Sequence, residues 1–202
     1  MAAYTPRPRA FSDSLVSLQL HESAVNNLVD QLELNGGTFT VAQLRQRIEQ
    51  KFNWPGLLKA DPESDDTEVT FADRDAVRVR CEDGRLEFNL AIVKLQSGSR
   101  SWRNFNVGVW YRPKTVGDAV ELARDGTISL KGERLSMQSQ FVLRGTFSRI
   151  FSDDRNVPLL AEQLRSDPRL AGLQVTQFVI EDGWLGLALG PHRGTAVPAM
   201  AR

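Results

Sequence analysis

The chain has 202 residues, of which 41% are hydrophobic and 25% are charged, and 25 basic residues balance 25 acidic residues to a formal net charge of zero. This composition is typical of a globular protein with one ample domain or two small ones. The neutral balance argues against a general nucleic-acid binder. The single cysteine excludes an intramolecular disulfide framework or a multi-cysteine metal site. The sequence contains no run of about 18 apolar residues, so it does not predict a membrane-spanning helix.

Both ends of the chain have the composition of linkers. Residues 1–13 are rich in Pro, Arg and Ser and lack the apolar core of a signal peptide. We expect residues 1–13 and 191–202 to be flexible, with His192 solvated, and residues 14–190 to form one α+β domain. The sequence leaves the compartment open. If the chain is a fragment of a longer exported protein, we expect an extracytoplasmic location.

The first elements are a strand and two helices. Residues 14–20 alternate between apolar and polar side chains and predict a short strand. Apolar residues then recur at helical spacing over residues 25–32, and Asn-Gly-Gly at 35–37 ends this helix. A second helix is expected to begin near Thr40, because Gln43 follows three residues later and fits a capping box.

The only cysteine lies in a predicted hairpin. Asp83-Gly84 suits a two-residue turn, because both turn positions need positive φ. The resulting register places Cys81 opposite Leu86, on the apolar face of the hairpin. We therefore predict that Cys81 is a core residue with a raised pKa and not a reactive nucleophile.

Two further Asp-Gly pairs predict hairpins of the same kind, and three hairpins indicate an antiparallel sheet. Asp125-Gly126 fits a three-residue bulged loop, and Asp182-Gly183 fits a two-residue loop. The expected cross-strand pairs are Leu122 with Ile128, Val120 with Leu130, Ile180 with Leu185, and Phe178 with Leu187.

Two helices are expected in the second half of the chain. The first spans residues 135–151, with an apolar stripe of Leu143, Phe147, Ile150 and Phe151, and the second begins at Pro158. The whole pattern predicts an α+β fold in which about four helices pack on a curved antiparallel meander sheet.

Some residues have the types found in catalytic or metal sites. His21, Glu22 and Ser23 include hydrolase residue types, but adjacent helical positions do not share a face, so we interpret them as a helix start. The acidic residues Asp61, Glu63, Asp65, Asp66 and Glu68 lack the spacing of a calcium loop and are interpreted as a solvated loop. With two histidines, a His-rich metal site is not expected, and we predict no cofactor.

Basic and aromatic residues interleave between positions 100 and 114, as on some single-stranded nucleic-acid platforms. Strand alternation separates the aromatic side chains onto two faces, which an ordinary half-buried strand explains without a nucleic acid. The residues concerned are Arg100, Arg103, Arg112, Lys114, Trp102, Phe105, Trp110 and Tyr111.

Part of the sheet is expected to be apolar on both faces. In the segment 86–95, Leu86 and Ile92 lie on one face, while Val93 and Leu95 lie on the other. Helices can cover one face, and a partner protein, an upstream domain or a lipid in an apolar groove would cover the other. The groove residues that we predict are Phe88, Leu90, Trp110, Phe141, Leu143, Phe147 and Phe151.

Two segments carry resemblances to known families. SLQLHESAVNNLVDQL (residues 17–32), a strand running into a helix through acidic, small and Asn residues, is similar to openings of periplasmic proteins of the tubular lipid-binding (BPI-like) type. That resemblance implies a curved meander wrapped around a long helix, here 135–151, that holds acyl chains; the two internal helices and the closing hairpin depart from it. QFVIEDGWLGLALGP (residues 177–191) resembles uncharacterised proteins of planctomycete bacteria, which implies a domain without a known activity.

The sequence thus favours a non-enzymatic binding or interaction domain with an apolar groove for a lipid or another hydrophobic small molecule. The alternative is a structural domain of a larger envelope protein that docks on a protein partner. An unrecognised hydrolase is a third and weaker hypothesis, because no phosphate loop, dinucleotide-binding glycine pattern, nucleophile elbow or zincin helix is present.

Overall fold

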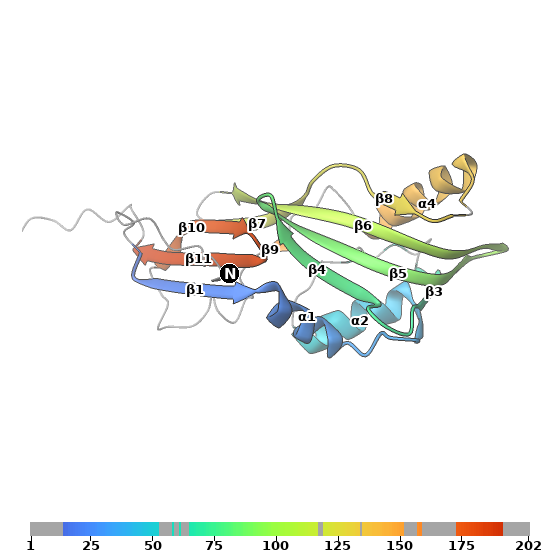
Figure 1. The fold of residues 1–202 in the computed structure, drawn as a ribbon, viewed down its shortest axis with the longest axis horizontal. Coiled ribbons are helices and arrows are strands. Elements are labelled where there is room, and N and C mark those ends of the chain that lie inside the picture. Colours follow the sequence, from blue (N-terminus) through green and yellow to red (C-terminus); the bar gives the residue numbers. More distant parts are fainter. Residues whose placement is uncertain are drawn as a thin grey trace, which may run out of the picture.

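The computed structural model describes residues 14–52, 58, 61, 65–116, 119–133, 135–151, 157–158 and 173–191. Within these residues the chain has two antiparallel sheets and three helices, an α+β arrangement as predicted (Figure 1). The helices are α1 (Glu22–Asp30), α2 (Val41–Phe52) and α4 (Met137–Ile150). The larger sheet contains β2 (Thr38–Thr40), β3 (Glu68–Phe71), β4 (Val77–Glu82), β5 (Arg85–Ser97), β6 (Arg100–Val116), β7 (Ala119–Arg124), β8 (Ser129–Lys131) and β9 (Val157–Pro158). The smaller sheet contains β1 (Val16–His21), β10 (Leu173–Glu181) and β11 (Trp184–Pro191).

The larger sheet is built around two long strands, β5 and β6, which pair with each other along most of their length. β4 and β3 share the other edge of β5, and β7 and β8 share the other edge of β6. β2 continues the sheet beyond β3, and β9 continues it beyond β7. The sheet is therefore not the single meander that we predicted, because each long strand pairs with two short strands along its outer edge.

The smaller sheet joins the two ends of the described chain. Its strand order is β1-β11-β10, so the first strand pairs with the last one. The β10–β11 hairpin has the predicted register, with Ile180 opposite Leu185 and Phe178 opposite Leu187. The helix that we expected to begin at Pro158 is not seen there, since Pro158 belongs to strand β9, and residues 159–172 lie outside the described residues.

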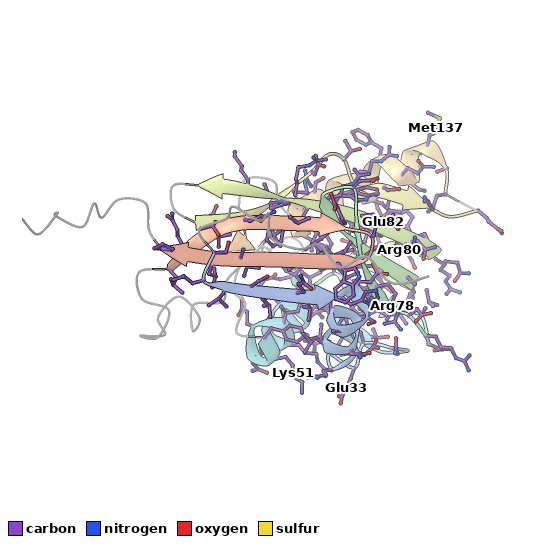
Figure 2. The ribbon with its side chains drawn as sticks, turned by 60° about the vertical axis from the view of Figure 1, so that its left-hand side comes forward. Glu33, Lys51, Arg78, Arg80, Glu82 and Met137 are labelled. Atoms are coloured by element: carbon purple, nitrogen blue, oxygen red, sulfur yellow. The ribbon has the colours of Figure 1, made fainter. Side chains whose placement is uncertain are left out.

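The β4–β5 hairpin also has the predicted register. Cys81 pairs with Leu86 and Val79 with Phe88, and Cys81 is fully buried, as expected for a core residue. The opposite face of β4 is polar. Figure 2 labels Arg78, Arg80 and Glu82, which alternate along the strand with the buried residues.

The hairpin predicted at Asp125-Gly126 is wrong. β7 and β8 do not pair with each other, because both pair with β6: Leu122 lies opposite Pro113, and Leu130 lies opposite Val107. The backbone N–H of Asp125 donates to the Trp110 carbonyl at 2.7 Å and keeps the connecting loop beside β6. A strand as long as β6 offers an edge that accommodates both segments, which local turn chemistry does not reveal.

The second apolar face predicted for β5 does not form. Ile92 and Leu95 are both buried in the same core, although strict alternation would place them on opposite faces. The register between β5 and β3 shifts by one residue at Val93, as in a β-bulge, and the neighbouring β6 has a positive φ of 52° at Asn104. The bulge returns Leu95 to the core and leaves Val93 42% exposed.

Side-chain caps begin the first two helices. The Nδ1 atom of His21 accepts from the backbone N–H of Ser23 at 3.2 Å, at the start of α1. At the start of α2 the predicted capping box is confirmed: the Thr40 N–H donates to Gln43 Oε1 at 2.9 Å, and the Gln43 N–H donates to Thr40 Oγ1 at 3.2 Å. α4 presents the predicted apolar stripe to the core, where Leu143, Phe147, Ile150 and Phe151 are buried.

Helix α1 covers the free edge of β4 with two side chains. The Asn26 side-chain amide donates to the Val79 carbonyl at 2.9 Å, and its oxygen accepts from the Val79 N–H at 2.8 Å. One turn earlier, the Glu22 carboxylate accepts from the Cys81 N–H at 2.9 Å. The N–H and C=O of Val79 and the N–H of Cys81, which no other strand pairs with, are thus satisfied by side chains of a helix.

The two confirmed hairpins meet at their tips. The Gly183 N–H donates to the Cys81 carbonyl at 2.9 Å, and the Gly84 N–H donates to the Ile180 carbonyl at 3.0 Å. The Gly183 carbonyl also accepts from the Glu22 N–H at 2.8 Å, at the start of α1. These backbone bonds connect the smaller sheet to the larger one, and both glycines have positive φ, as their turns require.

We expect Asn26→Ala to lower the free energy of unfolding by about 1–3 kcal/mol, because the buried backbone N–H and C=O of Val79 would lose their partners. The matched control is Asn27→Ala, which removes the same side chain from the next, exposed position of α1 and should change stability by about 0.5 kcal/mol or less. Urea denaturation followed by circular dichroism measures both. Equal losses in the two variants would contradict this role of Asn26.

Candidate functional site

A large apolar cavity lies between the two sheets and the helices. Its volume is about 430 Å³, and its wall is formed by residues of β1, β11, α1, α2, the larger sheet and the C-terminal part of α4. All 25 described residues that line it are Val, Leu, Ile or Phe. Packed protein interiors contain few voids larger than a water molecule, so a space of this size is unusual for a core.

The same sequence patterns that build the core also build the cavity wall. Alternate residues of the β4–β5 hairpin face it, among them Val79, Phe88 and Leu90. The apolar stripes of α1 and α2 face it from the other side, with Val25 and Leu44 as examples. Strand and helix periodicity therefore converge on one space that the described side chains do not fill.

Four of the seven predicted groove residues line this cavity: Phe88, Leu90, Phe147 and Phe151. Leu143 is fully buried in the core but does not line the cavity. Phe141 is 78% exposed, because it lies two residues before Leu143 and so on the other side of α4.

Trp110 also lies outside the cavity. It follows Val109 and precedes Tyr111, which both point into the core, so the alternation of β6 turns Trp110 to the other face of the sheet. There the guanidinium carbon of Arg85 lies 5.6 Å from the centre of the Trp110 ring. The sheet thus separates Trp110 from the other predicted groove residues.

Sequence reasoning missed most of the cavity wall. The lining residues of β1, α1, α2 and β11, such as Leu20, Val29, Ile48 and Leu187, belong to apolar patterns that we interpreted as ordinary core. Hydrophobic spacing identifies which residues face inward, but it does not state whether the facing surfaces touch. Only the distances between the elements distinguish a cavity wall from a packed core.

The three residues of hydrolase type, His21, Glu22 and Ser23, take part in contacts that hold the start of α1 in place. The Ser23 hydroxyl lies 2.9 Å from His21 Nδ1, the same nitrogen that accepts from the Ser23 backbone N–H. The Glu22 carboxylate binds the backbone N–H of Cys81. His21 instead packs its ring edge-on against Trp184, with ring centres 4.9 Å apart. These contacts anchor α1 to β4 and β11.

The acidic segment forms an ion pair with α2. Asp65 accepts two hydrogen bonds from the guanidinium of Arg45, at 2.7 and 3.0 Å, and this contact lowers the pKa of the Asp65 carboxyl. Asp66 and Glu68 are exposed, while Glu63 lies outside the described residues. Across the described part of the chain, no group of three His, Cys, Asp or Glu side chains is arranged to hold a metal ion.

The basic and aromatic residues of β6 do not share one surface. Phe105 and Tyr111 are buried in the core, and Trp102 packs against it. Trp110 stacks with Arg85 on the opposite face, and Arg112 there pairs with Asp125 at 3.1 Å. The half-buried strand that we expected is confirmed for Phe105, Val107, Val109 and Tyr111, which all lie on the buried face.

Cys81 is held as a neutral thiol. Burial, with a smaller effect of the Glu22 carboxylate, raises the pKa of Cys81 from 9.0 to about 12. A thiol of this kind carries almost no thiolate at neutral pH, and the thiolate is the nucleophilic form.

Comparison with known proteins gives no family assignment: no protein-family model matches the chain, and no curated protein matches it significantly. The two resemblances noted in the sequence therefore stay predictions. Among the helices that the structure describes, none is both long and apolar enough to cross a membrane.

We expect the thiol of Cys81 to resist an aromatic disulfide reagent at pH 8 in the folded protein and to react fully after unfolding in urea, because the fold buries it and raises its pKa. Absorbance of the released reagent measures the reaction. Rapid reaction of the native protein would show that Cys81 is accessible.

The raised pKa of Cys81 also predicts a pH dependence of stability. The folded chain keeps the thiol proton up to a pH of about 12, whereas the unfolded chain releases it near pH 9.0. The contribution of this thiol to the free energy of unfolding is therefore fully present below pH 9.0 and decreases as the pH rises toward 12. Cys81→Ala should lose less stability over that range than the parent protein. Tyr111 also has a pKa raised to about 12 by burial, but it is present in both proteins and cancels in the comparison.

Proposed function

We propose that this protein is a non-enzymatic binding domain that holds an apolar ligand, a lipid or another hydrophobic small molecule, in the cavity between its two sheets. The observation that carries the proposal is the lining: 25 hydrocarbon side chains around about 430 Å³. Small-molecule sites commonly have volumes of about 300–1,000 Å³. An engineered cavity of about 150 Å³ lined by such residues stays dry and binds benzene.

Energetics favour an occupied cavity. Water finds no hydrogen-bond partner on side chains of Val, Leu, Ile and Phe, so ordered water is a poor occupant. Unfilled apolar cavities in protein cores destabilise the folded state, because the lining side chains lack packing partners. An apolar occupant of this space would therefore add to the stability of the folded state.

The lining also restricts the chemistry of the ligand. A charged or strongly polar group inside this cavity would lose its hydration and gain no partner from the described wall, at a cost of several kcal/mol. The buried part of the ligand is therefore hydrocarbon. This argument supports binding over hydrolysis, because the polar side chains of His21, Glu22 and Ser23 are already engaged in contacts that fix α1.

A second candidate function is that of a structural domain docking on a protein partner. The observation that favours it is a pair of exposed apolar residues one turn apart on α4, Met137 at 89% and Phe141 at 78% exposure. Figure 2 shows Met137 at the outer edge of the molecule, and Met137 is not among the residues that line the cavity. Two side chains make a small surface, whereas the cavity wall involves three helices and both sheets, so the ligand-binding function has the stronger support.

Native mass spectrometry of the purified chain, followed by organic extraction and lipid analysis, tests the proposal. We expect a mass excess of one ligand per chain, which disappears on extraction with organic solvent. A purified chain that is free of ligand and also fails to bind a fluorescent fatty-acid probe would overturn the proposal and favour a protein partner.

We expect Leu90→Glu to weaken binding of a fluorescent fatty-acid probe by at least tenfold, because Leu90 lines the cavity and a carboxylate there would be desolvated without a partner. Val93→Glu is the matched control: it places the same charge on β5, three residues later, at a 42% exposed position outside this cavity. Probe titration measures both affinities.

Folding of the two variants is compared first by circular dichroism and urea denaturation. If Leu90→Glu does not fold, Leu90→Trp provides a neutral alternative that occupies part of the cavity and should also weaken binding. Equal probe affinity of folded Leu90 variants and the Val93 control would contradict ligand binding in this cavity.

A further inference from the structure

The described wall of the cavity has one exposed edge. Of its described lining residues, only Leu18 of β1 and Leu28 of α1 are exposed, by 52% and 45%. At the other extreme, Leu122 of β7 and Phe147 of α4 are 1% and 2% exposed. Leu18 and Leu28 therefore form the exposed edge of the cavity, which we call the mouth. Leu122 and Phe147, which are buried and lie on elements other than β1 and α1, are called the floor.

The mouth is formed by two consecutive elements of the chain, β1 and α1. β1 ends at His21 and α1 begins at Glu22, so the two mouth residues lie on consecutive elements, and Figure 1 shows α1 continuing beyond the end of β1. Apolar exposure continues from the mouth along β1, where Val16 is 44% exposed. Isolated exposed leucines are common on protein surfaces, but these two also belong to the wall of an internal cavity.

The two ends of the cavity suit the two ends of an amphiphile. A polar head group at the floor would lie among fully buried hydrocarbon side chains, without water or partners. At the mouth it would keep its hydration. The volume of about 430 Å³ accommodates about 14 groups the size of a water molecule or a methylene, each of about 30 Å³. This is the size of one acyl chain and too small for two.

We propose that the ligand is a single-chain amphiphile of the fatty-acid or lysolipid type, which enters tail first between Leu18 and Leu28 and keeps its head group in water outside this mouth. The inference rests on the proposed ligand-binding function and deepens it. It assigns the orientation of the ligand, the place where it enters and the number of its chains.

Paramagnetic relaxation on the isotope-labelled full chain tests the orientation. Two fatty-acid probes are compared, one with a nitroxide next to the carboxyl group and one with a nitroxide near the methyl end, each against its chemically reduced form. The carboxyl-end label should broaden the amide signals of Leu18 and Leu28, and the methyl-end label those of Leu122 and Phe147. The reverse pattern would overturn the inference.

A charge pair at the mouth gives a second test. Leu28→Lys should strengthen binding of a fatty acid, and Leu28→Glu should weaken it, each by roughly twofold to fivefold, the range of an exposed ion pair. For a long-chain alcohol, whose head group is neutral, the Lys and Glu variants of Leu28 should have the same affinity. The same two substitutions at Phe141, exposed but outside the cavity, are the control and should leave both affinities unchanged.

The outcomes separate the two proposals. If the parent protein binds neither the fatty acid nor the alcohol, the proposed function itself fails. If it binds both, but the Lys and Glu variants of Leu28 respond alike, or the carboxyl-end label broadens the floor, ligand binding stands and the mouth and orientation assigned here are wrong.

Discussion

The free edge of β4 is the constraint on which the rest of the structure depends. This strand pairs with β5 on one side only, and on the other side Asn26 and Glu22 of α1 take the place of a neighbouring strand. An unpaired edge invites association with other chains, and a helix that covers it prevents this. The same contacts fix the position of α1, and with it one wall of the cavity.

The contact between the two hairpin tips has a comparable effect on the other wall. The reciprocal bonds of Gly84 and Gly183 join the smaller sheet to the larger one at the tips of their hairpins. Apolar residues of β1 and β11 line one space together with those of β4 and β5. The cavity wall therefore depends on how the two sheets are connected, and not on any single side chain.

The sequence predicted features that depend on neighbouring residues. The registers at Asp83-Gly84 and Asp182-Gly183, the Thr40 capping box and the buried stripe of α4 all follow from local turn chemistry or periodicity, and all are confirmed. The Asp125-Gly126 hairpin failed because competition for the long edge of β6 decided the pairing. The bulge at Val93 and most of the cavity wall were missed for a related reason: both depend on how distant elements fit together. Four of the predicted groove residues line the cavity because they face inward, which periodicity does report.

The pairing of β1 with β11 has a consequence for the order of events during synthesis. β1 emerges from the ribosome among the first described elements, yet its strand partner is the last of them. Until β11 has been made, β1 carries its leucines without a sheet to cover them, and contacts between segments so far apart in the chain form slowly. The larger sheet, whose central hairpin is local, has no such delay. We therefore expect the nascent chain to complete the part of the cavity wall that belongs to the larger sheet before the part formed by β1 and β11.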